Sequence, residues 1–209
     1  MEPFTRVEEV ANYYLKAIQA VQHQSPYFLS GHSFGALVAF EMAQQLRKQG
    51  KNTALLAILD MPVLLPDREP IELDWDETQW IVAITQILEA LSGKKLGLGL
   101  EDFQPLKEDA QIALLKKGLE KAGMLPPGSG IKYIRSIINV IKADELAFLN
   151  YIPSAGYPDK ITLFKTEKGY SDELWIYSEM FWTSLHGDGS VYPPSLSKLL
   201  RCKAIIRQY

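Results

Sequence analysis

The stretch "YFLSGHSFGALVAFEMAQQL", residues Tyr27 to Leu46, contains the clearest structural signal in the chain. Its opening residues form a short apolar and aromatic run, which predicts a buried strand. Its second half has the spacing of a helix whose inner face is nearly all apolar. Between the two, Gly31 and Gly35 each lie two residues from Ser33. This order predicts a tight strand-to-helix corner that presents a serine for chemistry.

The two glycines are expected to have a steric role, because a Cβ atom at either position would crowd the neighbouring strand or helix. The corner would hold Ser33 in a strained backbone conformation and expose its Oγ atom. The backbone N–H of Phe34 and the helix N-terminus behind it would face a developing oxyanion. The alternative is an ordinary turn made by Gly31 and Gly35, with Ser33 as a helix N-cap.

The flanking segments extend this corner into an α/β pattern. Residues 7–22 have the apolar spacing of an amphipathic helix, and residues 27–29 form the strand before the corner. The helix over residues 37–46 is followed by Gly50, a plausible C-cap. Residues 53–59, "TALLAIL", form an unbroken apolar run that predicts a strand covered on both faces. Helix, strand, helix and strand in this order indicate a parallel sheet with right-handed crossovers.

A helical block interrupts this pattern over about residues 66–150. Helical periodicity is found over residues 80–91, 109–122 and 131–149, while "LSGKKLGLGL" and "MLPPGSG" are typical of flexible joints. The sheet resumes at residues 161–165, and a further helix is predicted over residues 171–185. We therefore predict one domain, residues 1–209, with an α/β fold, a mostly parallel sheet and a helical lid inserted over the strand ends.

A serine nucleophile needs a histidine base and an orienting carboxylate. Asp60 closes the predicted strand over residues 53–59, so it would lie at the same sheet edge as Ser33; the alternative is a turn aspartate. Of the histidines, His32 points away from Ser33 and His23 lies at a helix end. His186 is the remaining candidate base, and the alternative is a solvated loop histidine.

Composition excludes several other classes of function. The net charge is −3 and the pI about 5.7, so nothing favours nucleic-acid binding. The single cysteine, Cys202, excludes an internal disulfide framework and fits a reducing compartment. No signal-peptide pattern and no membrane-spanning apolar run are present, so we expect a cytoplasmic protein without membrane contact. Asp74, Asp76 and Glu77 lack metal-ligand spacing and indicate a helix start.

The segment "PYFLSGHSFGALVAFEMAQQLRKQGKNTALLAILD" resembles the thioesterase domains of non-ribosomal peptide synthetases and polyketide synthases. The resemblance extends from residue 2 to about residue 191 and implies a partial α/β-hydrolase fold with a helical lid. It also implies that Ser33 takes an acyl or peptidyl chain from the phosphopantetheine thioester of a carrier protein. The acyl or peptidyl group on Ser33 would then be transferred to water, or to a hydroxyl or amine of the same acyl or peptidyl chain, which gives an acid or a macrocycle. No bound cofactor is implied.

The sequence departs from the family at both ends. The family has further strands before the helix over residues 7–22, and a loop among them supplies the second oxyanion donor. The family histidine follows the final strand in a Gly-x-His setting, whereas the tail over residues 192–209 contains no histidine. These departures leave three functions open: a carrier-dependent thioesterase, a catalytically silent relic that at most binds acyl chains or a carrier protein, and a general carboxylesterase.

Overall fold

The computed structural model describes residues 2–59, 61, 73–154, 156–165 and 205–208. It contains six helices and four strands among those residues. In chain order they are α1 (Val7–Val21), β1 (Tyr27–His32), α2 (Phe34–Lys48), β2 (Thr53–Leu59), α3 (Glu77–Ser92), α4 (Leu100–Phe103), α5 (Glu108–Lys121), α6 (Ile131–Asn150), β3 (Thr162–Lys165) and β4 (Ile205–Gln208).

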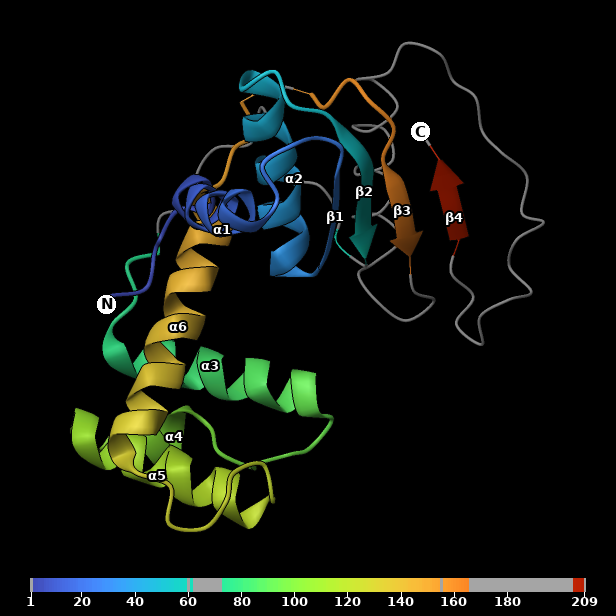
Figure 1. Ribbon diagram of the computed structural model, residues 1–209. Helices are drawn as coiled ribbons and strands as arrows, with labels where there is room; N and C mark the ends of the chain where they lie inside the picture. Colours follow the sequence, from blue (N-terminus) through green and yellow to red (C-terminus); the bar gives the residue numbers. More distant parts are fainter. Residues whose placement is uncertain (1, 60, 62–72, 155, 166–204, 209) are drawn as a thin grey trace. The chain divides into compact units, whose positions relative to one another are not determined.

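The four strands form one sheet in the order β1-β2-β3-β4 (Figure 1). β1, β2 and β3 are parallel, and β4 pairs antiparallel with β3. The predicted parallel sheet is thus confirmed, and the prediction for residues 161–165 is correct to within one residue. The sequence analysis proposed no structure for the tail, yet part of it, β4, extends the sheet.

Helix α2 begins directly after the corner and has a well-defined end. Gly50 adopts a positive φ of 70°, a conformation that costs a glycine little. Its N–H donates to the Arg47 carbonyl at 2.9 Å, and the Lys51 N–H donates to the Leu46 carbonyl at 2.9 Å. This pair of bonds is the Schellman motif, so Gly50 ends α2 as predicted.

One hydrophobic core joins α1, α2, the sheet and the chain that leads into β3. Helix α2 is buried on nearly all sides, including the polar side chains of Glu41 and Gln44. The opposite face of the sheet is different, because Phe28 is 69% exposed and its cross-strand partner Leu55 is 40% exposed. The prediction that β2 is covered on both faces is therefore wrong for its first half.

The helical block forms a core of its own. The chain divides into two compact units, one made of residues 1–3 and 71–146 and the other of residues 4–70 and 147–209. Side chains from α3, α4, α5 and α6 make up the core of the first unit. α3 starts with a capping box, in which Asp76 accepts from the Gln79 N–H and Gln79 from the Asp76 N–H. The acidic cluster therefore marks a helix start, as predicted.

The segment "LSGKKLGLGL", predicted to be a flexible joint, is anchored by hydrogen bonds. The Glu89 carboxylate accepts from the backbone N–H groups of Leu96 and Gly97 and from the Lys95 ammonium. The end of the segment also contributes to the short helix α4, which the sequence analysis missed. The helix predicted over residues 171–185 lies outside the described residues. Among the described residues, no helix is long and apolar enough to cross a membrane.

Candidate active site at the Ser33 corner

Ser33 lies between the last residue of β1 and the first residue of α2. Its φ is 52° and its ψ is −129°, and it is the one non-glycine with positive φ in the described part of the chain. Residues with a side chain rarely adopt such a conformation, because the Cβ atom approaches the backbone. Two bonds fix it: the Ser33 N–H donates to the Leu59 carbonyl at 3.1 Å, and the Ala36 N–H donates to the Ser33 carbonyl at 2.8 Å.

The two glycines of the corner have different roles. A Cβ atom on Gly31 would lie 1.9 Å from the Gly35 carbonyl oxygen, so only glycine fits at this position. A Cβ atom on Gly35 would meet no heavy atom within 4 Å among the described residues. The predicted crowding is therefore correct for Gly31 and wrong for Gly35. The backbone of Gly35 creates the close approach, while its own Cα faces open space.

Ser33 occupies the N-cap position of α2, but its hydroxyl makes no capping hydrogen bond. An ordinary N-cap residue has extended backbone angles and a side chain that accepts from the first turn. The interpretation of Ser33 as a simple cap is therefore wrong. Within the described residues, no acceptor is bonded to the Phe34 N–H, the first free donor of the helix. The Ser33 hydroxyl and the Phe34 N–H therefore both lie at the N-terminus of α2.

Of the three residues of the predicted triad, the structure describes only Ser33. Leu59 accepts the Ser33 N–H bond and is the cross-strand partner of His32. Asp60, predicted as the acid, and His186, predicted as the base, lie outside the described residues. His32 is exposed at the end of β1. His23 lies in the connection that enters β1, whereas Ser33 follows the other end of that strand.

Sequence reasoning missed a set of hydrogen bonds between α2 and the segment that follows α6. The segment made of residues 151–154 and 156–159, here called the strap, lies along α2. Tyr151 donates from its hydroxyl to the buried Glu41 carboxylate at 2.8 Å. Ser154 donates to the Gln44 carboxamide oxygen at 3.2 Å and accepts from the Lys48 ammonium at 3.2 Å. The signal in the sequence was Glu41 itself, a charged residue inside an otherwise apolar helical face.

Burial, with the charge of Glu41 as the second cause, raises the pKa of Tyr151 far above its ordinary value. The Tyr151 hydroxyl therefore stays protonated and acts as a donor. Gln45 donates from its carboxamide to the second Glu41 oxygen at 2.9 Å and to the Glu8 carbonyl at 3.0 Å. These bonds connect the helix that carries Ser33 at its start with α1 and with the strap.

Among the described residues, no group of three or more His, Cys, Asp and Glu side chains could hold a metal ion.

Comparison with known proteins supplies the family. The sequence model of the family described as Thioesterase domain matches residues 1–116, more than half of the 209-residue chain. The nonribosomal peptide synthetase btyA of Aspergillus terreus is 43% identical over 111 residues, 53% of this chain and 12% of that protein. Polyketide synthase PksR of Bacillus subtilis is 33% identical over 130 residues, 57% of this chain and 5% of that protein. The chain thus spans a small part of these relatives' length.

A solved structure agrees with the sequence matches. The crystal structure of holo-AB3403, a four-domain nonribosomal peptide synthetase bound to AMP and glycine, superposes with a TM-score of 0.74. The sequence identity is 25%, and the match covers 89% of this chain and 14% of that one. The mostly parallel sheet with its helical block agrees with the predicted partial α/β-hydrolase fold. The chain belongs to the thioesterase domain family, of the kind that nonribosomal peptide synthetases and polyketide synthases carry.

Proposed function

We propose that this chain is a serine thioesterase that releases an acyl or peptidyl chain from the phosphopantetheine thioester of a carrier protein. The observation that carries the proposal is the Ser33 conformation, with φ at 52° and a hydroxyl that makes no capping bond. Strained backbone of this kind persists only where the surrounding structure enforces it, and it concentrates at functional sites. Membership in the family supplies the thioester as the bond attacked.

In the proposed reaction, Ser33 Oγ attacks the thioester carbonyl while a base takes its proton. The Phe34 N–H donates to the oxyanion, and the dipole of α2 stabilises the same charge. The carrier arm leaves as its thiol, with the proton that the base took from Ser33, and an acyl-Ser33 ester remains. Water, or a hydroxyl or amine of the acyl chain, then attacks the ester, so the product is an acid or a macrocycle.

Asp60 and His186 complete the proposed triad. Support for Asp60 comes from its sequence position, because it directly follows Leu59, whose carbonyl accepts the Ser33 N–H bond. His186 is proposed because His23 and His32, the other histidines of the chain, are poorly placed. His186 would take the Ser33 proton and return it to the leaving group, while Asp60 would orient the imidazole.

The proposed partner is an acyl or peptidyl carrier protein, which presents the substrate on its phosphopantetheine arm. The matched relatives are a synthetase and a synthase by name, and the solved structure is that of a four-domain synthetase; this supports a carrier-bound substrate. No resident cofactor is needed, since the serine and its base carry out the whole acyl transfer. The expected location is the cytoplasm.

A fluorophosphonate probe tests the nucleophile directly, because it phosphonylates only an activated serine. We expect one probe per intact chain, attached to Ser33, and no labelling of the Ser33→Ala variant. Failure of the wild-type chain to label while it is folded would favour the catalytically silent relic. Circular dichroism of both proteins controls for folding.

A pair of substrates then separates the thioesterase from a general carboxylesterase. We expect the acyl-N-acetylcysteamine thioester to be turned over with a higher kcat/KM than the p-nitrophenyl ester of the same acyl group. The reverse order would indicate a carboxylesterase, since p-nitrophenolate is the more easily expelled group.

A further inference from the structure

Glu41 places a charged group among the buried residues of α2. It is 4% exposed, and no other charged residue of the described chain is buried. Its carboxylate accepts from the Tyr151 hydroxyl at 2.8 Å and from the Gln45 carboxamide at 2.9 Å. Both donors are neutral, and in the described part of the chain no Lys, Arg or His forms an ion pair with Glu41. Hydrogen bonds alone therefore hold this charge in the core.

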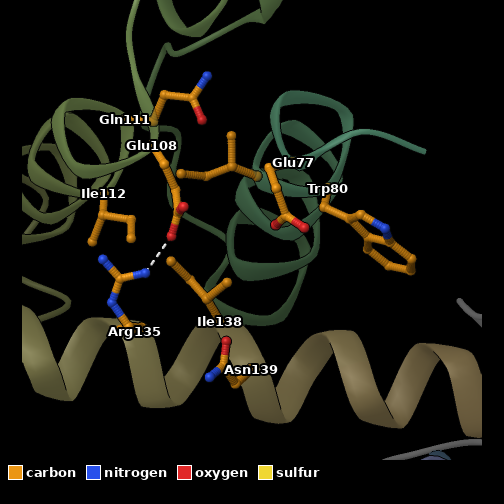
Figure 2. A pocket seen from close by; sticks show the side chains of 9 residues that line it. Glu77, Trp80, Glu108, Gln111, Ile112, Arg135, Ile138 and Asn139 are labelled. Carbon is orange, nitrogen blue, oxygen red and sulfur yellow. Dashed lines mark hydrogen bonds and ion pairs between the residues drawn. The ribbon is translucent and has the colours of Figure 1, made fainter.

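The carboxylates that line the pocket of the helical unit show the more usual arrangement (Figure 2). Glu108 bonds to the Arg135 guanidinium, and Glu77 bonds to the Lys142 ammonium at 2.7 Å. Both glutamate side chains are more than half exposed. A paired cation and the surrounding salt solution screen such charges within a short distance. Glu41 has no paired cation and little contact with solvent, so its field reaches further through the protein.

Glu41 lies eight residues after Ser33 in the sequence, on the helix that begins at the corner. An α-helix rises about 1.5 Å per residue, so about 12 Å of helix axis separates the two residues. Between them, residues 36–40 of α2 are all buried. At this distance and an effective dielectric constant of roughly 20 to 80, one unit charge changes an ionisation equilibrium about two- to tenfold. The Glu41 charge can therefore influence an ionisation at the corner.

Few other charges face Glu41. Helix α1 brings Glu8, which is paired with Arg6 at 3.4 Å. The strap brings Tyr151, whose raised pKa keeps the hydroxyl neutral. The core residues that the sheet contributes are apolar or aromatic. The remaining charged groups next to α2 lie toward its other end and are Arg47 with Asp159, and Lys48. Glu41 is therefore the unpaired buried charge nearest to Ser33 among the described residues.

We propose that Glu41 stabilises the positive charge that the base gains when it takes the proton of Ser33. The inference rests on the proposed serine mechanism: the base must approach Ser33 Oγ, so it lies about as far from Glu41 as Ser33 does. A negative field favours the protonated base, which therefore binds the proton more tightly. Glu41 touches no substrate, so it is a positioning residue that acts through the base. The same charge opposes the oxyanion, and the informative quantity is the pH dependence.

Glu41→Gln removes the charge and retains the size of the side chain and an acceptor for Tyr151. The rate at which a fluorophosphonate labels Ser33 is measured as a function of pH on the intact chain. We expect the midpoint of the rise in rate to move down by about 0.3 to 1 pH unit. Well below this midpoint, the variant should label about two- to tenfold faster, relative to its own plateau. An unchanged or higher midpoint would overturn the proposal.

Two controls separate the charge from its structural role. Glu8→Gln removes a carboxylate of α1 that is paired with Arg6 and partly exposed, and should move the midpoint by less than about 0.1 pH unit. Tyr151→Phe keeps the Glu41 charge and removes a hydrogen bond, so it should lower stability without moving the midpoint. Equal midpoint shifts in Glu41→Gln and either control would contradict the assignment. Glu41→Met is the second charge-free variant, in case Glu41→Gln disturbs the fold.

An NMR titration of the His186 imidazole, the proposed base, requires no reactivity. Its midpoint should fall by the same amount in Glu41→Gln. A shift of this midpoint in a chain that the probe does not label would reject the nucleophile and support the charge effect. Labelling of both proteins with identical pH midpoints would support the nucleophile and reject the charge effect. Absence of both labelling and midpoint shift would reject both.

Discussion

At the scale of single residues, the corner shows how far local sterics define a site. The glycine-serine-glycine spacing predicted a strained serine, and the backbone angles of Ser33 agree with that expectation. This was predictable because the atoms that crowd the corner, those of Gly31 and Gly35, lie within two residues of Ser33 in the sequence. The steric role of Gly35 could not be predicted from spacing, because it depends on which way its Cα faces in the folded chain.

Substitution of the two glycines by alanine separates their roles. Gly31→Ala places a Cβ atom 1.9 Å from the Gly35 carbonyl oxygen, and the backbone must move. We expect a loss of about 3 kcal/mol or more in the free energy of unfolding, or failure to fold. Gly35→Ala should change it by less than about 1 kcal/mol. Urea denaturation of both variants measures the difference, and similar losses would contradict this account.

The histidine variants test the proposed base at the same scale. His186→Gln is expected to slow the reaction of Ser33 with a fluorophosphonate by roughly 10³-fold or more, because the hydroxyl then keeps its proton. Asp60→Asn should slow it as well. His32→Gln, which removes the histidine next to Ser33 in the sequence, serves as the matched control and should label at the wild-type rate. A slow His32→Gln variant with a fast His186→Gln variant would reverse the assignment.

At the scale of elements, β1, α2 and β2 followed from sequence patterns, whereas the contact between α2 and the strap did not. Alternation along β1 places Leu29 in the core at 8% exposure and Phe28 outside at 69%. The contact between Glu41 and Tyr151 spans 110 residues, and no local pattern connects the two. Helix α4 was missed because four residues are too few to show a periodicity.

Neighbouring positions on β1 should respond in opposite ways to threonine, a good strand former. Phe28→Thr is expected to change the free energy of unfolding by less than about 1 kcal/mol and to lower the binding of the apolar dye ANS. Leu29→Thr should cost about 2–5 kcal/mol, because it removes a buried side chain. Chemical denaturation and dye fluorescence measure both effects. A large loss for Phe28→Thr would show that this face is covered in solution.

Removal of the Tyr151 hydroxyl tests the attachment of α2 to the strap. Tyr151→Phe is expected to lower the free energy of unfolding by about 1–3 kcal/mol, since it leaves the buried Glu41 carboxylate short of a donor. Tyr13→Phe, at an exposed tyrosine, is the matched control and should have no effect.

We also expect the wild-type chain and the Tyr151→Phe variant to differ in how their stability changes at alkaline pH. Burial raises the pKa of Tyr151 in the folded chain, while the unfolded chain loses this proton near the ordinary tyrosine pKa of 10.0. Stability is therefore fully present below pH 10 and falls as the pH rises above it, by up to about 1.4 kcal/mol per unit. Tyr151→Phe should lack this contribution to the slope. Equal alkaline slopes for the two proteins would contradict the raised pKa.

At the scale of the whole molecule, helix α6 belongs to both compact units. Its residues up to 146 lie in the helical unit, and Ala147 begins the part that enters the sheet unit. The sequence predicted a helical block between two strands, and two separate hydrophobic cores agree with it. It could not predict that the chain leaving the block runs back along α2, because such contacts join distant segments.

The strap has a consequence for experiments that divide the polypeptide. A break between Gly128 and Ser129, in an exposed connection ahead of α6, leaves α2 and β2 on one fragment and the strap and β3 on the other. Each fragment then contains residues that complete the hydrophobic core of the other. The two pieces should therefore reassemble when they are expressed separately, as in split-reporter systems. Co-purification through a tag on one piece measures this, and a Tyr151→Phe piece should be recovered less efficiently.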